Sequence, residues 1–146
     1  MNINEINSLT EKIIGFAINV HKELGPGLLE KVYQRCLKIA LEEDNLKVEA
    51  EVPVKLTYHG KEITDESFRI DLLVEDNIII ELKSVSKLTD VFTKQLGTYL
   101  KLANKPCGLL INFNEALLKD GIKRSLNGYY NVNLTEDFYT TLDLSL

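Results

Sequence analysis

The sequence predicts a single α/β domain over residues 1–146, in which helices flank a mixed, mainly antiparallel sheet. Apolar residues recur at helical spacing in the first part of the chain, and the hydrophobic period then shortens towards two between Val48 and Lys83. A further helical segment follows, and after it comes a short, wholly apolar segment that is typical of a buried strand. A strand that follows a crossover helix is expected to lie parallel to a neighbour, so the sheet should be mixed.

The composition is that of a globular protein, with 45% hydrophobic and 27% charged residues. No segment approaches the roughly 20 apolar residues of a membrane span, and the amino-terminal segment lacks the pattern of a signal peptide. We therefore expect a soluble, cytoplasmic protein. Cys36 and Cys107 lie in apolar contexts and are expected to be buried thiols. Because His21 and His59 stand alone, the sequence has no cysteine–histidine cluster with the spacing of a zinc site.

Two helices are expected in the amino-terminal part. Ser8, with Glu11 three residues later, forms the pattern of a capping box at the start of the first helix. Gly25 and Pro26 end that helix. The second helix begins in the segment GLLEKVY, where Glu30 lies at the edge of an apolar stripe. This stripe comprises Leu29, Val32, Tyr33, Cys36, Leu37 and Ala40.

Three strands are expected next. Residues 48–58 alternate between apolar and polar side chains, and His59 with Gly60 forms a turn. Residues 66–74 and 77–83 make the second and third strands.

One more helix and one more strand complete the prediction. Thr89 or Asp90 begins a helix that runs to about Asn104. Residues 107–113 then form the buried strand, and the remaining chain is expected to be irregular.

The second and third strands should form a hairpin. The turn-like residues 75–77 make a three-residue loop that pairs Val74 with Ile78. A two-residue loop would mix apolar and charged residues on both sides of the sheet, so it is rejected. One side of the hairpin is then wholly apolar and consists of Ile70, Leu72, Val74, Ile78, Ile80 and Leu82.

The other side of this hairpin gathers charge. Asp71 faces Glu81 and Arg69 faces Lys83, and directly opposed residues have Cβ atoms about 4.5–5.5 Å apart. Two facing carboxylates repel each other, and a divalent cation between them would remove the conflict. Hard oxygen ligands suit Mg²⁺ or Mn²⁺. The alternative interpretation is that Arg69 and Lys83 neutralise the two acids in a surface charge cluster.

Charge is distributed unevenly along the chain. The net charge of −5 argues against non-specific binding to nucleic acid. Residues 82–124, however, hold 8 basic and 3 acidic side chains, which gives this segment a net charge of +5. Its lysines, Lys87 and Lys94 among them, are candidates for guiding a nucleic-acid backbone, a contribution to affinity that falls with salt.

The hairpin resembles a known signature. Asp71, Glu81 and Lys83 match the D-x9-E-x-K spacing of the PD-(D/E)XK nuclease superfamily, although the proline that usually leads the signature is absent. GLLEKVY is similar to the motif that names the GxxExxY family. Five blocks of that family occur in the same order between residues 21 and 126. They are HKELGPGLLEKVY, IDLLVEDNIIIELK, QLGTYLKL, GLLINFN and DGIKRSL.

The resemblance implies a restriction-endonuclease-like core and a catalytic metal site. Asp71 and Glu81 would be metal ligands, helped by the backbone carbonyl of Leu82. Lys83 would act on the attacking water and the phosphate. Glu30 would complete the metal site from the preceding helix, and its alternative is an ordinary solvent-facing helix glutamate.

The third helix carries a further match. Gln95 and Tyr99 form the Q-x3-Y element of the recombination-exonuclease branch, in which the glutamine lines the site. Being four residues apart, they share a helix face. Tyr99, Lys87 and Lys94 would then contact nucleic acid, whereas helix packing is the alternative role of Tyr99. His21 is left outside the catalytic set, because a packed helix histidine accounts for it equally well.

The function implied is hydrolysis of phosphodiester bonds in nucleic acid with Mg²⁺ or Mn²⁺, DNA being favoured over RNA. One rival is a nucleic-acid-binding or interaction module that keeps the fold without cleaving. A second is a structural ion cluster in a subunit of a larger assembly. The oligomeric state is left open, and a homodimer is compatible with the sequence.

Overall fold

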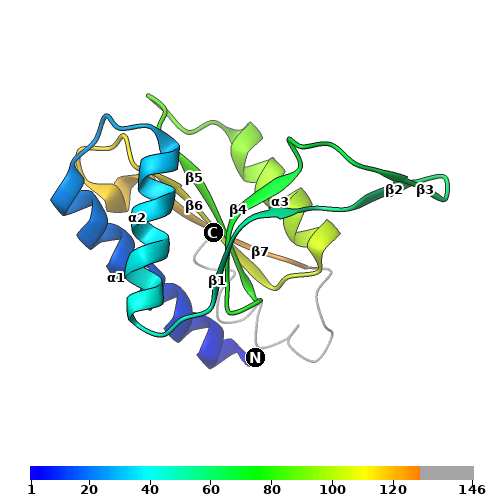
Figure 1. Cartoon of the computed structure of the whole chain (residues 1–146), viewed down its shortest axis with the longest axis horizontal. Helices are drawn as coiled ribbons and strands as arrows, with labels where there is room; N and C mark the ends of the chain where they lie inside the picture. The colour runs from blue at the N-terminus through cyan, green and yellow to red at the C-terminus, as the bar shows by residue number, and fades with distance from the viewer. Residues whose placement is uncertain (129–146) are drawn as a thin grey trace.

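The computed structural model describes residues 1–128, which form three helices, seven strands and one short 3-10 helix (Figure 1). The helices are α1 (Ile3–Leu24), α2 (Glu30–Glu43) and α3 (Asp90–Ala103). The strands are β1 (Val48–Pro53), β2 (Leu56–Tyr58), β3 (Lys61–Ile63), β4 (Arg69–Val74), β5 (Ile78–Lys83), β6 (Cys107–Asn112) and β7 (Ile122–Leu126). The 3-10 helix, η1 (Leu118–Gly121), precedes β7. No helix in this part of the chain is long and apolar enough to cross a membrane.

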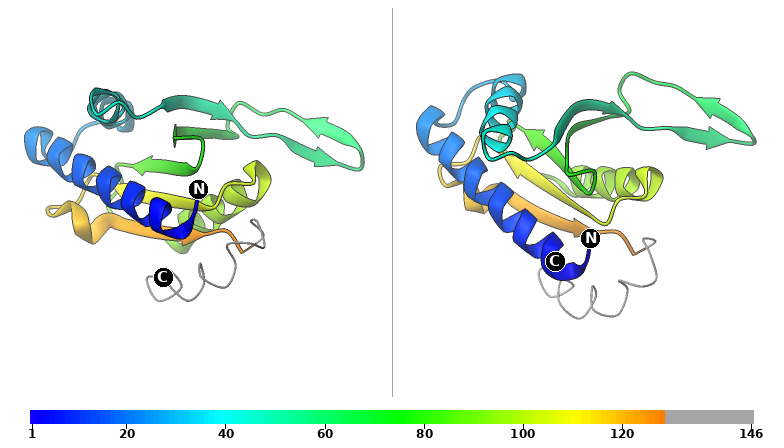
Figure 2. Two further views of the ribbon diagram at one scale, coloured as in Figure 1. Left: turned by 90° about the horizontal axis from the view of Figure 1, so that it is seen from below. Right: turned by 60° about the horizontal axis from the view of Figure 1, so that its bottom comes forward.

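Five strands form one mixed sheet in the order β1-β4-β5-β6-β7. Strands β5 and β6 are parallel, as expected for strands joined through the crossover helix α3, and the other neighbours are antiparallel. One apolar cluster joins α1 and α2 to one face of the sheet, and a second joins α3 to the opposite face (Figure 2). The predicted α/β architecture is confirmed.

Helix α1 begins earlier than the capping box predicted. Asn2 is its N-cap, and the Asn2 side chain accepts a hydrogen bond from the backbone N–H of Glu5 at 2.9 Å. Ser8 therefore lies inside the helix, and its predicted capping role is wrong. The helix extends towards the amino terminus because Ile3 and Ile6 are buried in the core there.

The buried face of helix α2 differs in part from the apolar stripe that the sequence predicted. Tyr33, Leu37 and Leu41 are fully buried, whereas Leu29 is 78% exposed and Val32 is 39% exposed. Leu29 is the N-cap residue, so it precedes the helical turn that packs on the sheet. The predicted stripe is wrong at its amino-terminal end and is confirmed at Tyr33 and Leu37.

The hydroxyl of Tyr33 ties down the connection between the first two helices. It donates a hydrogen bond to the carbonyl of Gly25 at 2.5 Å and accepts one from the backbone N–H of Leu28 at 3.1 Å. Its ring stacks on that of Phe113, with the centroids 4.3 Å apart. Tyr33, anchored in the core, therefore fixes the position of the α1–α2 loop. The first turn of α2, which follows this loop, is positioned with it.

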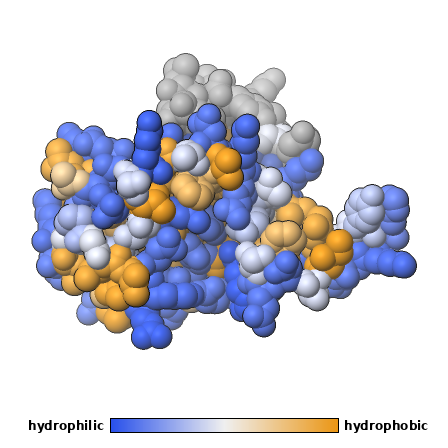
Figure 3. All heavy atoms as spheres, turned by 90° about the horizontal axis from the view of Figure 1, so that it is seen from above, coloured by the Kyte–Doolittle hydropathy of each residue, from blue (hydrophilic) through white to orange (hydrophobic). Residues whose placement is uncertain are grey.

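The segment predicted as one strand over residues 48–58 is divided. Strand β1 ends at Pro53, which has no N–H to continue a ladder, and the backbone N–H of Val54 donates to the carbonyl of Phe68 at 2.8 Å. Strands β2 and β3 form a separate two-stranded hairpin, whose outer part is mostly hydrophilic and projects from the body (Figure 3). The predicted turn is confirmed, since His59 and Gly60 have φ of 50° and 76°.

The carboxyl-terminal half follows the prediction more closely. Thr89 is the N-cap of α3, and all residues of β6 are buried. Helix α3 approaches the sheet closely at Gly108, where an added Cβ would lie 2.8 Å from a methyl group of Leu96. Strand β7 was missed, because Lys123 and Arg124 interrupt its apolar pattern at the sheet edge. The tail after residue 113 was predicted to be irregular; its described part contains η1 and β7, and residues 129–146 lie outside the described residues.

The two cysteines were expected to be buried thiols, and this is confirmed for one of them. Both cysteines are free, and Cys107 is buried whereas Cys36 is partly exposed. His21 is buried, and its Nε2 lies 2.8 Å from the carbonyl oxygen of Glu115, which agrees with a packing role.

Candidate active site

The β4–β5 hairpin has the predicted register up to a defined point. Val74 pairs with Ile78, and the ladder continues to Leu72 opposite Ile80. In the loop, Glu75 and Asp76 adopt φ of 49° and 57°. The three-residue loop is thereby confirmed.

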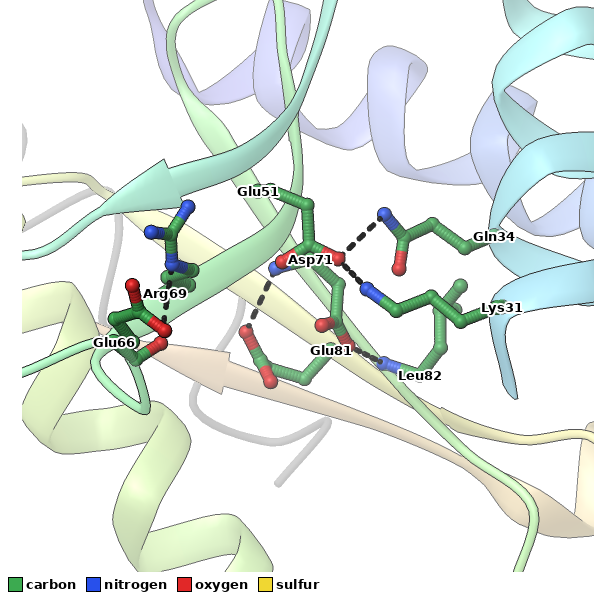
Figure 4. A network of polar contacts seen from close by, with 8 residues as sticks. All are labelled: Lys31, Gln34, Glu51, Glu66, Arg69, Asp71, Glu81 and Leu82. Carbon is green, nitrogen blue, oxygen red and sulfur yellow. Dashed lines mark hydrogen bonds and ion pairs between the residues drawn. The ribbon is translucent and has the colours of Figure 1, made fainter. Parts of the chain in front are cut away.

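Beyond Leu72 the backbone ladder is replaced by side-chain hydrogen bonds. The backbone N–H of Leu82 donates to Oδ2 of Asp71 at 2.8 Å, and the backbone N–H of Asp71 donates to Oε1 of Glu81 at 3.3 Å (Figure 4). The two acids therefore converge, as the sequence predicted, although no direct Asp71–Glu81 backbone pair belongs to the ladder.

The strand continues irregularly on the amino-terminal side of Asp71. The predicted pairing of Arg69 with Lys83 is wrong, because the β4–β5 ladder ends at Leu72 opposite Ile80; Arg69 pairs only on the other side of β4, with Pro53 of β1. Ile70, predicted on the face of Leu72, packs in the opposite cluster, with α3. Counting back from the loop therefore gave the correct β4–β5 partners only for the residues that belong to the backbone ladder.

Burial dominates the electrostatics of the two acids. Burial raises the pKa of Asp71, and the N–H of Leu82 opposes this shift. Burial, followed by the charge of Asp71, raises the pKa of Glu81 from 4.5 to about 8. Glu81 is only 6% exposed, so water screens its charge poorly.

The predicted neutralising cations are otherwise engaged. Arg69 donates through Nε to the carbonyl of Glu66 at 3.1 Å. Lys83 places Nζ over the ring of Phe92, 4.7 Å from its centroid. Within residues 1–128 neither cation forms an ion pair with Asp71 or Glu81, although the charge of Lys83 lowers the pKa of both acids. The surface-cluster alternative therefore lacks its contacts.

Glu30 lies close enough to act on the two acids through its charge. It occupies the exposed first turn of α2, and its charge raises the pKa of both Asp71 and Glu81. Yet the described part of the chain contains no group of three or more carboxylate, imidazole or thiol side chains placed to hold a metal. Glu30 therefore stands beside the two-carboxylate site.

Gln95 and Tyr99 meet on α3 as predicted. Gln95 donates through Nε2 to the Tyr99 hydroxyl at 3.2 Å, and that hydroxyl donates to the carbonyl of Ser67 at 3.2 Å. Burial, and then the charge of Glu81, raises the pKa of Tyr99. The Tyr99 hydroxyl therefore holds the segment between β3 and β4, and its ring packs in one cluster with Ile70, the residue before Asp71.

The two lysines proposed to contact nucleic acid lie on the surface. Lys87 follows β5 in the loop to α3, and Lys94 is on the exposed side of α3.

Two features of the site were missed by sequence reasoning. The first is a network on the α2 side: Lys31 forms an ion pair with Glu51, and Gln34 donates to Oε1 of Glu51 at 3.2 Å. The available signal was a glutamine directly after Tyr33 and one turn from Leu37, on the apolar side of the helix, where a polar side chain needs a partner.

The second missed feature is Asn112, a fully buried amide at the end of β6. Its Oδ1 accepts from the N–H of Val85 at 3.1 Å, and its Nδ2 donates to the carbonyl of Val85 at 3.0 Å. Asn112 thereby holds the segment directly after Lys83. A polar residue within an apolar strand was the available signal.

The chain is similar to known proteins. A protein-family model for the PD-(D/E)XK nuclease superfamily matches residues 7–125. Among solved structures, the crystal structure of SSO0001 is similar, with 25% sequence identity and a TM-score of 0.45. The match covers 75% of this chain and 57% of that chain, so this chain spans little more than half of its length. No curated protein matches the sequence. The mixed sheet with helices on both faces agrees with the restriction-endonuclease-like core expected of the superfamily.

Proposed function

Because the chain belongs to the PD-(D/E)XK nuclease superfamily, we propose that it is a metal-dependent nuclease that hydrolyses phosphodiester bonds, with DNA as the favoured substrate. One observation carries this proposal. Asp71 and Glu81 are two carboxylates that converge in a largely buried site, where each accepts a hydrogen bond from a backbone N–H and neither has an ion-pair partner within residues 1–128. Isolated buried carboxylates are costly, and a divalent cation offsets that cost.

The donor set fits Mg²⁺ or Mn²⁺. Each carboxylate has further lone pairs beyond its backbone hydrogen bond, and hard oxygen ligands are what these cations prefer. Asp71, Glu81 and the carbonyl of Leu82 would hold the cation, and Glu30, which stands beside these ligands on α2, would add its negative charge to the site. When bound, such a cation lowers the pKa of a coordinated water and screens the charge of the phosphate.

The remaining residues are proposed to handle the phosphate and the nucleic-acid chain. Lys83 lies two residues after Glu81 on β5, and its ammonium is supported by the ring of Phe92. It would stabilise charge on the phosphate and orient the attacking water. Gln95 would line the same site, and Tyr99, Lys87 and Lys94 would contact the nucleic acid, the lysines through its backbone.

We further propose that the chain belongs to the GxxExxY family within the superfamily. Each position of that motif has a physical role here. Gly27 has φ of 99°, a conformation that favours glycine. Tyr33 ties the α1–α2 loop to the core, and Glu30 stands between them, beside the acids.

The experiment is a cleavage assay with labelled DNA and RNA in Mg²⁺, Mn²⁺ or EDTA. We expect cleavage that requires the cation and is lost in Glu81→Gln. Retention of nucleic acid without cleavage under every condition would favour the non-cleaving binding module. Activity in EDTA, or in the Glu81→Gln protein, would overturn the assignment of the site.

A further inference from the structure

Glu51 has an unusual backbone conformation beside the two acids. Its φ is 54°, in the left-handed region that residues with a side chain rarely adopt inside a strand. The β1–β4 pairing is made immediately before and after Glu51, so this residue lies next to Asp71 of β4. A strained conformation of this kind persists only where the surrounding contacts enforce it.

Those contacts come from the first two turns of α2. The carboxylate of Glu51 forms an ion pair with Lys31, and its Oε1 also accepts a hydrogen bond from Gln34 at 3.2 Å (Figure 4). The side chain of Gln34 is buried at 7% exposure, so its amide needs a partner there. Glu51 is therefore the common acceptor for two side chains of one helix.

Lys31 is held next to the two acids, because its ion-pair partner Glu51 lies beside Asp71 between β1 and β4. Its charge acts on Asp71 in the direction that favours the ionised carboxylate. Lys31 directly follows Glu30, the acid proposed to contribute to the metal site. An ammonium this close, if released, would pair with a carboxylate of Asp71 or Glu81 and compete with a divalent cation for the same oxygens.

We propose that Glu51 is a positioning residue that binds Lys31 and so keeps its ammonium off Asp71 and Glu81, leaving both carboxylates available to a divalent cation. This inference rests on the proposed function, because it concerns the same metal site. The same contacts account for the strain at Glu51: in this conformation its carboxylate is the partner of both Lys31 and Gln34.

The test is a double-mutant cycle read out by Mn²⁺ affinity, measured by titration calorimetry in the absence of nucleic acid. Glu51→Gln should raise the Kd for Mn²⁺ about fivefold, the size expected for one partly exposed charge contact. The double variant with Lys31→Met should restore the affinity of the wild type. A merely structural role of Glu51 would not be rescued by removal of Lys31. Glu49→Gln is the matched control, because Glu49 is on the same strand and pairs with Lys47 at the surface.

A second variant protects the test against loss of folding. Glu51→Gly accepts the left-handed φ without strain, which offsets part of the cost of leaving the amide of Gln34 without its acceptor. It should therefore still unfold in one cooperative thermal transition in EDTA, yet bind Mn²⁺ more weakly. Unchanged Mn²⁺ affinity in both Glu51 variants, or no rescue by Lys31→Met, would overturn the positioning role alone. Wild-type protein that binds no Mn²⁺ would overturn both this role and the metal site. Wild-type protein that binds Mn²⁺ but cleaves nothing would overturn only the nuclease function.

Discussion

The side chain of Asp71, on β4, accepts a hydrogen bond from the backbone N–H of Leu82, on β5, at 2.8 Å. An acid thus occupies the position where a strand carbonyl would continue the antiparallel ladder. This hydrogen bond holds the Asp71 carboxylate in place and leaves the other lone pairs of the carboxylate free. The proposed metal ligand is thereby held by the sheet itself, so it needs no ordering for a cation to bind.

Asp71→Asn should separate the stability of the apo protein from its response to metal. In EDTA the variant should melt at or above the wild-type temperature, because the amide oxygen still accepts from Leu82 while the repulsion with Glu81 is gone. Wild type should gain about 2.7 kcal/mol at a hundredfold excess of Mn²⁺ over its Kd, a melting shift of several degrees. The variant should gain little. Thermal melts with EDTA and with Mn²⁺ measure this, and a destabilised variant beside a metal-indifferent wild type would contradict the metal site.

Glu81 should make the apo protein less stable as the pH rises. The pKa of Glu81 is about 8 in the folded protein and 4.5 ordinarily, so between these values the folded state holds a proton that the unfolded state has released. Stability therefore falls as the pH rises through this window. Asp71, whose pKa is also raised, acts in the same direction.

Glu81→Gln should flatten this decline, while the surface variant Glu49→Gln should keep it. The measurement is the urea unfolding free energy in EDTA from pH 5 to about 8.5. Parallel profiles for wild type and Glu81→Gln would show that Glu81 titrates at its ordinary pKa.

Lys83→Ala should abolish cleavage and leave metal affinity largely intact. Lys83 contacts the ring of Phe92, and its charge acts on both acids without an ion pair to either one. Its removal should slow the chemical step without taking away a ligand. Single-turnover cleavage rates and Mn²⁺ titration check the two parts, with Lys38→Ala as control because Lys38 pairs with Glu42 on the surface of α2. A wild-type rate in Lys83→Ala would remove its assigned role.

Glu30→Gln should weaken metal binding or activity with little effect on folding. The side chain is exposed in the first turn of α2, where losing an acid costs about 0.3–1 kcal/mol of helix-dipole stabilisation. Its charge nevertheless reaches both acids of the site. Mn²⁺ titration and cleavage kinetics are the measurements. Unchanged values for both would make Glu30 an ordinary surface glutamate.

Sequence alone determined the features that depend on residues close together in the chain. The alternating pattern and the short loop at residues 75–77 set the register of the β4–β5 hairpin, and this brought Asp71 and Glu81 together on one side. Gln95 and Tyr99 met for the same reason, because four residues in a helix make one turn. In both cases the local backbone geometry allows only one relative placement of the two side chains, so the sequence pattern was enough to predict that they lie together.

Tertiary structure decided what depends on partners distant in the chain. The pairing of β1 with β4, the addition of β7 and the face that α2 buries all follow from packing across the sheet. Glu51 shows the physical reason most clearly. Its alternating position in β1 predicts an ordinary strand residue, yet it adopts a left-handed conformation beside Asp71 and its carboxylate contacts Lys31 and Gln34 of α2. A strained backbone conformation cannot be read from the sequence of the strand, because the contacts that compensate for the strain come from another element. Here those contacts form when helix α2 packs on the sheet.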